Sequence, residues 1–122
     1  MENIFSDEFS PLKGLRVLDL SDEKGELCGR ILGDLGADVL KIESSSGTVS
    51  RSLGPFAPDG TSLYFAYRNL NKRSAVIDFH KTESIVDLFA LIKQSDILIE
   101  TFLPGTLTEL GLSPELLLSE NP

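Results

Sequence analysis

The chain has 122 residues, of which 41% are hydrophobic and 25% charged, a composition typical of one folded soluble domain. Its 11 Lys and Arg residues against 19 Asp and Glu give a formal charge of -8, so its surface repels nucleic-acid backbones and no nucleic-acid partner is expected. No apolar run reaches the length of a membrane span or signal peptide, and Cys28 has no second cysteine to pair with. We therefore expect a cytoplasmic protein without membrane contact, in which Cys28 is a buried, inert thiol.

The first third of the chain contains two runs of strand length, 15–20 (LRVLDL) and 37–43 (ADVLKIE). Both are apolar and contain branched residues, which is typical of buried strands. Between them Leu27, Ile31 and Leu35 recur at four-residue spacing, which places them on one face of a predicted helix. The pattern predicts a β-α-β unit.

The rest of the chain continues the alternation after an interruption. Residues 44–71, rich in Ser, Gly and aromatic residues, are predicted to form a long structured loop. A strand at 74–79 (SAVIDF), a helix at 82–95 and a strand at 96–102 (DILIETF) follow. A last short helix is predicted at 113–118, where serine can cap the helix and proline can occupy its first turn.

Strands that alternate with helices predict an α/β fold, here a Rossmann-like parallel sheet flanked by helices. Parallel neighbours need a crossover long enough to hold a helix, and such crossovers are right-handed. We expect a tail at 1–10 and a single domain at 11–122. Because the chain stops where the alternation calls for a further strand, we expect this domain to be incomplete at its C-terminus.

A β-α-β unit of this kind raises the question of dinucleotide binding. Glu43 stands at the end of the second predicted strand, where a dinucleotide-binding fold keeps its ribose-binding acid. The turn at 21–26 (SDEKGE), however, lacks the glycines that let a backbone approach pyrophosphate, and it places three carboxylates where phosphate would sit. NAD or FAD binding is therefore not expected, and Glu43 is interpreted as a solvated acid.

Four ordered blocks carry a more specific signal. They are Pro11-Leu-x-Gly-Leu-Arg-Val-Leu-Asp-Leu-Ser21, Leu35-Gly-Ala-Asp-Val-Leu-Lys-Ile-Glu43, Asn71-Lys-Arg-Ser74 followed by Ile77-Asp78, and Asp96-Ile-Leu-Ile-Glu-Thr-Phe-x-Pro-Gly105 followed by Leu110-Gly111-Leu112. From Pro11 to its end the chain thus resembles the N-terminal portion of the family III CoA-transferases, the group of formyl-CoA transferase, carnitine CoA-transferase and methylacyl-CoA racemase. Unrelated Rossmann-like domains would not be expected to share the Asn-Lys-Arg-Ser block.

The resemblance implies an interlocked homodimer that transfers CoA between acyl groups and binds CoA on its Rossmann-like domain. It also implies an aspartate beyond residue 122 that forms an acyl anhydride and then CoA thioester intermediates, dividing one difficult step into easier ones. This chain alone is therefore expected to be inactive. CoA or acyl-CoA is expected as a weak ligand, and no covalently bound cofactor is expected.

Several positions that match CoA-binding residues of the family depart from its pattern. Ser44 stands where an arginine commonly follows the Lys-Ile-Glu strand end, and His80 replaces a lysine. Thr101 replaces an asparagine, and Glu109 replaces an arginine. Because a charge-assisted contact is worth about 1.5–3 kcal/mol, losing several would lower CoA affinity by orders of magnitude, and we expect a degenerate CoA pocket.

The remaining candidate contacts are Lys24, Lys72, Arg73, Asp78 and Phe102. Lys72 and Arg73 either hold an anion or anchor the long loop by pairing with nearby acids. Phe102 either stacks on the adenine of CoA or packs in the core. The lone histidine, at position 80, is expected to be a surface residue and not a metal ligand.

A second interpretation, from a different functional class, remains open. The chain could be a non-catalytic scaffold or interaction module that never meets CoA. Such a module would use the apolar sheet edge left by the missing strand to pair with another chain.

Overall fold

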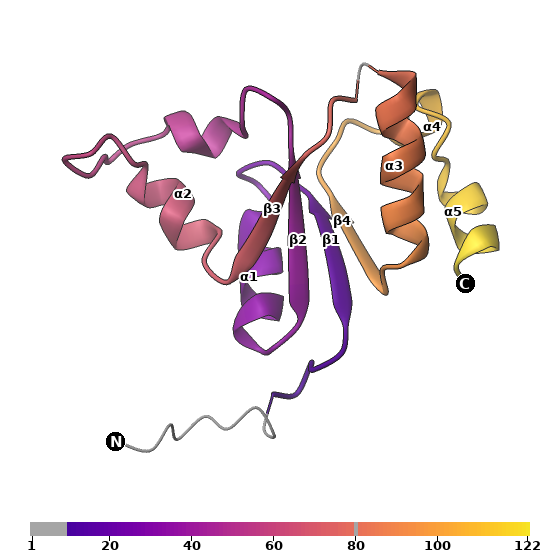
Figure 1. Cartoon of the computed structure of the whole chain (residues 1–122), viewed down its shortest axis with the longest axis horizontal. Coiled ribbons are helices and arrows are strands. Elements are labelled where there is room, and N and C mark those ends of the chain that lie inside the picture. Colours follow the sequence, from indigo (N-terminus) through magenta and orange to yellow (C-terminus); the bar gives the residue numbers. More distant parts are fainter. Residues whose placement is uncertain (1–9, 80) are drawn as a thin grey trace.

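The computed structural model describes residues 10–79 and 81–122, which form a parallel sheet between two groups of helices (Figure 1). The four strands are β1 (Arg16–Leu20), β2 (Asp38–Glu43), β3 (Lys72–Val76) and β4 (Ile97–Glu100). The helical elements are α1 (Glu26–Asp34), the 3-10 helix η2 (Val49–Ser52), α2 (Leu63–Arg68), α3 (Thr82–Lys93), α4 (Thr106–Glu109) and α5 (Pro114–Glu120).

The strand order β3-β2-β1-β4 confirms the predicted Rossmann-like α/β class. From β1 the chain adds β2 and β3 on one side, and it then crosses over to place β4 on the other side of β1. The order of the strands therefore reverses between β1 and β4. In open α/β sheets, ligands bind outside the carboxyl ends of the strands at such a switch point.

The boundaries of several elements differ from the predictions. The predicted strand at 74–79 begins two residues earlier and ends at Val76, because Lys72 and Arg73 pair with β2 in spite of their charge. The predicted loop at 44–71 contains η2 and α2, and the Ser62 hydroxyl caps α2 by accepting the Phe65 N–H at 3.0 Å. The short helix α4 was not predicted.

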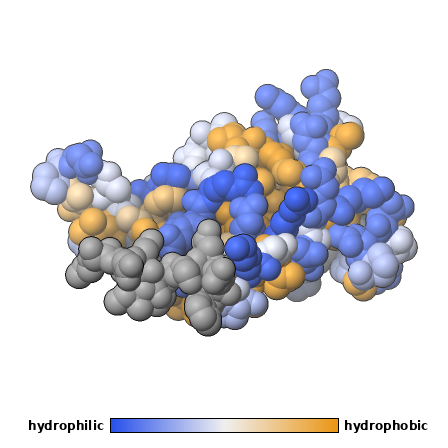
Figure 2. All heavy atoms as spheres, turned by 60° about the horizontal axis from the view of Figure 1, so that its bottom comes forward, coloured by the Kyte–Doolittle hydropathy of each residue, from blue (hydrophilic) through white to orange (hydrophobic). Residues whose placement is uncertain are grey.

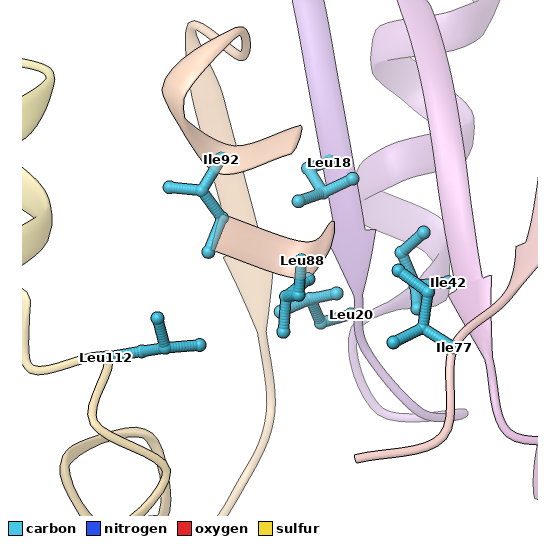
Figure 3. Close-up of a cluster of buried hydrophobic side chains, with 7 residues drawn as sticks. All are labelled: Leu18, Leu20, Ile42, Ile77, Leu88, Ile92 and Leu112. Carbon is cyan, nitrogen blue, oxygen red and sulfur yellow. The ribbon is translucent and has the colours of Figure 1, made fainter. Parts of the chain in front are cut away.

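One face of the sheet carries the main apolar core. Because side chains alternate along a strand, Leu18 and Leu20 of β1 and Ile42 of β2 point to the same side, where α3 covers them. Figure 3 shows these side chains gathered with those of Ile77, Leu88, Ile92 and Leu112. This cluster joins α3 and the segment before α5 to the sheet and is the main apolar contribution to stability.

The opposite face of the sheet carries a smaller apolar cluster around Val17 and Val39 and, beside it, charged side chains that are buried. Asp19, Lys41 and Lys72 point from the strands toward α1, and each side chain is at most 1% exposed. Helix α1 meets this face through Glu26, Gly29 and Gly33, so the predicted apolar face of the helix lies outward. Leu27, Ile31 and Leu35 are 38%, 51% and 42% exposed.

Two predictions about single residues were wrong. Cys28 is exposed, since it lies on the outer side of α1 and the charged strand face takes up the inner side. Glu43 is only 4% exposed, because Arg51 folds back over it.

The surface mixes polar and apolar groups. Figure 2, with the bottom of Figure 1 turned forward, shows hydrophilic residues over much of this face and apolar residues exposed between them. None of the helices in the described part of the chain combines the length and apolar character needed to cross a bilayer.

Candidate functional site

Several predicted site residues follow directly after strands that run in the same direction. Ser44 follows β2, Asp78 lies two residues after β3, and Thr101 and Phe102 follow β4. Lys24 lies in the turn that follows β1. These five residues therefore share the carboxyl edge of the sheet, which is the upper edge in Figure 1.

The turn after β1 is joined to the end of β4 by hydrogen bonds. The Thr101 Oγ1 donates to Asp22 Oδ1 at 2.8 Å and accepts the Asp22 N–H at 2.9 Å. The Lys24 ammonium pairs with the same carboxylate, which holds the pKa of Lys24 above its ordinary value. Partial burial acts to raise the pKa of Asp22, but the hydrogen bonds from Lys24 and Thr101 outweigh it and lower that pKa.

Phe102 lies beside a second aromatic ring at this edge. Its ring meets that of Phe79 edge to face, with centroids 5.8 Å apart, and both rings pack against the main core. Phe102 is half-buried, so its packing against the core leaves part of the residue accessible.

A polar depression of about 330 Å³ lies where β2 and β3 end. Ser44 lines it, and Arg51 closes one side by donating to both Glu43 oxygens at 2.7 and 2.8 Å. The Ser74 hydroxyl donates to Glu43 at 2.8 Å. The Arg51 hydrogen bonds, aided by those from Ser74 and Thr48, lower the pKa of Glu43 to about 2.

Lys72 and Arg73 lie at the start of β3, away from the carboxyl edge. The Lys72 Nζ is buried and donates to Asp19 Oδ2 at 2.7 Å, to the Glu26 carbonyl at 2.7 Å and to Asn69 Oδ1 at 2.9 Å. Burial lowers the pKa of Lys72, although its pair with Asp19 acts in the opposite direction. Arg73 is exposed and forms a two-pronged pair with Asp38, at 2.8 and 2.6 Å. Both residues thus pair with nearby acids, but only Lys72 also contacts the segment predicted as a loop, through Asn69.

The last two predicted site residues have fewer described contacts. Glu109 is exposed at the end of α4, in the segment that follows β4. His80 lies outside the described residues. In residues 10–79 and 81–122, no group of three or more His, Cys, Asp or Glu side chains is arranged to hold a metal ion.

The first turn of α1, where a dinucleotide would bind, is closed by the protein itself. A Cβ on Gly25 would lie 2.7 Å from the Thr101 side chain and 2.8 Å from Ser21. Of the three carboxylates expected there, Glu26 points inward and is fully buried. Its Oε1 lies 3.0 Å from Lys41 Nζ and accepts the Ser50 hydroxyl at 2.7 Å.

The buried charges at Asp19, Lys41 and Glu26 were not predicted as part of the site. The sequence does carry a signal for Asp19 and Lys41, since each interrupts an otherwise apolar strand. Charged residues are almost never fully buried unless they are paired, so their positions call for partners. The pairing of Asp19 with Lys72, which lies 53 positions away in the sequence, could be identified only from the folded structure.

Comparison with known protein families gives one match over most of the chain. The sequence profile of CoA-transferase family III matches residues 12–122. Among curated proteins, the chain is 37% identical over 120 residues to a probable fatty acyl-CoA transferase of Mycobacterium tuberculosis, covering 96% of this chain and 30% of that protein. It is 40% identical over 113 residues to a formyl-CoA:oxalate CoA-transferase of Rhodopseudomonas palustris, covering 91% of this chain and 26% of that protein.

Solved structures give the same picture. A CAIB/BAIF family protein from Brucella suis superposes with a TM-score of 0.85 at 38% identity, over 92% of this chain and 31% of that one. A protein from Mycobacterium tuberculosis superposes with a TM-score of 0.82 at 37% identity, over 92% and 31%. The chain thus spans less than a third of the length of these relatives.

Proposed function

Because the chain belongs to CoA-transferase family III, we propose that it is the N-terminal, CoA-binding portion of an enzyme that transfers CoA between acyl groups. In this proposal the catalytic aspartate belongs to the part of the relatives that the chain does not match. The 122 residues alone are then inactive, and the longer protein is a cytoplasmic homodimer.

The observation that carries the proposal is the gathering of Lys24, Ser44, Asp78, Thr101 and Phe102 at one edge of the sheet. This edge includes the switch point between β1 and β4, where α/β sheets place their ligands. The depression beside Ser44 offers hydroxyl groups for the polar part of CoA. The accessible part of the Phe102 ring offers a surface on which an adenine can stack.

We also propose that the chain binds CoA with low affinity. Two cations at this edge are already neutralised within the chain, since Lys24 pairs with Asp22 and Arg51 pairs with Glu43. A ligand with several phosphate charges therefore competes with internal carboxylates for these two donors. The formal charge of -8 adds a general repulsion.

Restoring two arginines tests the site. In the variant Ser44→Arg/Glu109→Arg, we expect CoA to bind at least tenfold more tightly in isothermal titration calorimetry. Each new charge-assisted contact to phosphate is worth about 1.5–3 kcal/mol, and about 1.4 kcal/mol corresponds to a tenfold change in affinity.

A matched control makes the same change of charge elsewhere. Ser119→Arg/Glu115→Arg alters two exposed residues of α5, and Glu115, like Glu109, lies in the first turn of its helix. This control should change CoA affinity less than about threefold, because it acts only through the screened field of the whole domain. Equal affinities in the two variants would contradict the proposed site.

The alternative function, a scaffold or interaction module, is favoured by one observation. The free side of β4 borders a largely apolar groove of about 490 Å³ between α3 and α5. A chain that serves only as such a module should show no measurable affinity for CoA. It should also gain none from the two arginines, so the same titration separates the two functions.

A further inference from the structure

Four charged side chains lie buried between α1 and the sheet, and their charges balance. Asp19 pairs with Lys72, and Glu26 pairs with Lys41, at 2.7 and 3.0 Å. All four side chains are at most 1% exposed. A buried pair of this kind is poor evidence for stability, because apolar residues of similar size often serve as well. We therefore ask which other residues the two buried pairs hold in position.

Both pairs hold Ser21, the first residue after β1. Asp19 Oδ1 accepts the Ser21 N–H at 2.9 Å and also the Ser21 hydroxyl. Lys41 Nζ donates to the Ser21 carbonyl at 2.8 Å. The backbone donor, the backbone acceptor and the side chain of Ser21 are thus all bound by buried charged groups.

Ser21 in turn fixes the position of the next residue, which contacts the candidate site. The Asp22 backbone and carboxylate bind the Thr101 hydroxyl, and the same carboxylate pairs with Lys24. Hydrogen bonds therefore join Lys72 to Asp19 and Asp19 to Ser21, the peptide bond joins Ser21 to Asp22, and Asp22 in turn binds two candidate CoA contacts.

We propose that Asp19 is a positioning residue of the CoA site, with its buried charge balanced by Lys72. By binding Ser21 it sets the turn that orients Thr101 and Lys24 at the carboxyl edge. Lys72 neutralises the buried Asp19 carboxylate and does not touch the ligand. This inference rests on the proposed function, since it assigns a role in binding the same ligand.

Two double variants separate positioning from stability. Asp19→Asn/Lys72→Met and Asp19→Leu/Lys72→Met both remove the buried ion pair, and both lose the Lys72 bonds to Glu26 and Asn69 equally. They differ in one respect, because Asn keeps an oxygen that can accept from Ser21 and Leu does not. The Asn variant leaves a buried amide there, and the Leu variant leaves the buried Ser21 N–H and hydroxyl without their acceptor, so the two variants should have similar stability.

The expected result is that CoA affinity differs between the two variants although their stability does not. With Ser44→Arg/Glu109→Arg also present to strengthen CoA binding, the Asn variant should keep CoA affinity within about threefold of that background. The Leu variant should lose about tenfold or more, which corresponds to loss of the orienting hydrogen bonds. Hydrogen exchange of the amides at 21–25 should be at least about tenfold faster in the Leu variant than in the Asn variant.

Each other outcome overturns part of the argument. If exchange at 21–25 is the same in both variants, Asp19 does not set the turn. If exchange differs but CoA affinity does not, the turn does not position the site. If CoA does not bind even with Asp19 and Lys72 intact, the proposed function fails and the positioning role fails with it.

Discussion

Gly29 shows how closely α1 approaches the charged face of the sheet. A Cβ at this position would lie 2.6 Å from Asp19 Oδ2 and 3.1 Å from Lys72 Nζ. Asp19 cannot easily move away, since its two oxygens are bound by Ser21 and Lys72. The absence of a side chain at Gly29 is therefore what allows helix and ion pair to pack together.

We expect Gly29→Ala to lower the free energy of unfolding by about 1–3 kcal/mol, the usual cost of overpacking a tight interior. Gly33→Ala in the same helix is the matched control, because its Cβ would lie 3.4 Å from the nearest atom, an ordinary contact. Alanine favours a helix over glycine by up to about 1 kcal/mol, so the control should be neutral or stabilising. Urea denaturation measures both, and a similar change in the two variants would contradict the close approach at Gly29.

The three carboxylates after β1 illustrate what single residues could and could not reveal in the sequence. Their number is the basis of the prediction that the turn does not suit pyrophosphate. Their directions could not be read, because Asp22 turns to Thr101 at the end of β4 and Glu26 turns inward to Lys41. Which way an acid points depends on partners that only the folded chain brings near.

At the scale of elements, the Asn-Lys-Arg-Ser block joins β3 to four different parts of the domain. Asn71, in the left-handed region at φ 63°, donates to Asp34 at the end of α1. Lys72 reaches β1, Arg73 reaches the start of β2, and Ser74 reaches Glu43 at the end of β2. The Asn-Lys-Arg-Ser block, on which the family resemblance chiefly depends, therefore connects β3 to α1, to β1 and to both ends of β2.

The pair of Glu43 and Arg51 ties η2 to the end of β2, and its contribution should depend on pH. The folded-state pKa of Glu43 is lowered to about 2 from an ordinary 4.5, chiefly by its hydrogen bonds with Arg51. A lowered carboxyl pKa adds stability above the unfolded pKa, and this stability is lost as pH falls from about 4.5 toward 2. Because the Arg51 side chain is 47% exposed and solvent screens the pair, we expect it to contribute only about 1–2 kcal/mol to the free energy of unfolding at neutral pH.

The measurement compares Glu43→Gln with the unchanged protein by urea denaturation at several pH values. The stability gap between them should be largest near neutral pH and should narrow as the pH approaches 2. Asp38→Asn is a matched control, since Asp38 and Arg73 form the same two-pronged pair at the surface. An exposed ion pair contributes less than about 1 kcal/mol to the free energy of unfolding. If Asp38→Asn lowers this free energy as much as Glu43→Gln does, the burial of Glu43 does not strengthen its pair with Arg51.

For the molecule as a whole, the sequence predicted the fold class better than the boundaries of the elements. Apolar runs separated by helical patterns were sufficient for a parallel sheet, because few arrangements of such units obey the crossover rules. The start of β3 and the helices within 44–71 were missed where polar contacts, and not apolar periodicity, hold the structure. The candidate site could be placed at the strand ends, but not the buried charges beneath it.

The overall charge of -8 gives the last prediction, which concerns how salt affects CoA binding. In the unchanged protein the general repulsion of an anionic ligand is screened by salt, so affinity should stay constant or rise slightly as salt increases. In Ser44→Arg/Glu109→Arg the added contacts are attractive, and screening should weaken them. The Debye length falls from about 30 Å at 0.01 M to about 10 Å at 0.1 M, so titrations across this range cover the change. Affinities with opposite salt dependence would support a site that has lost its cations, whereas equal slopes would mean that the arginines do not face the ligand.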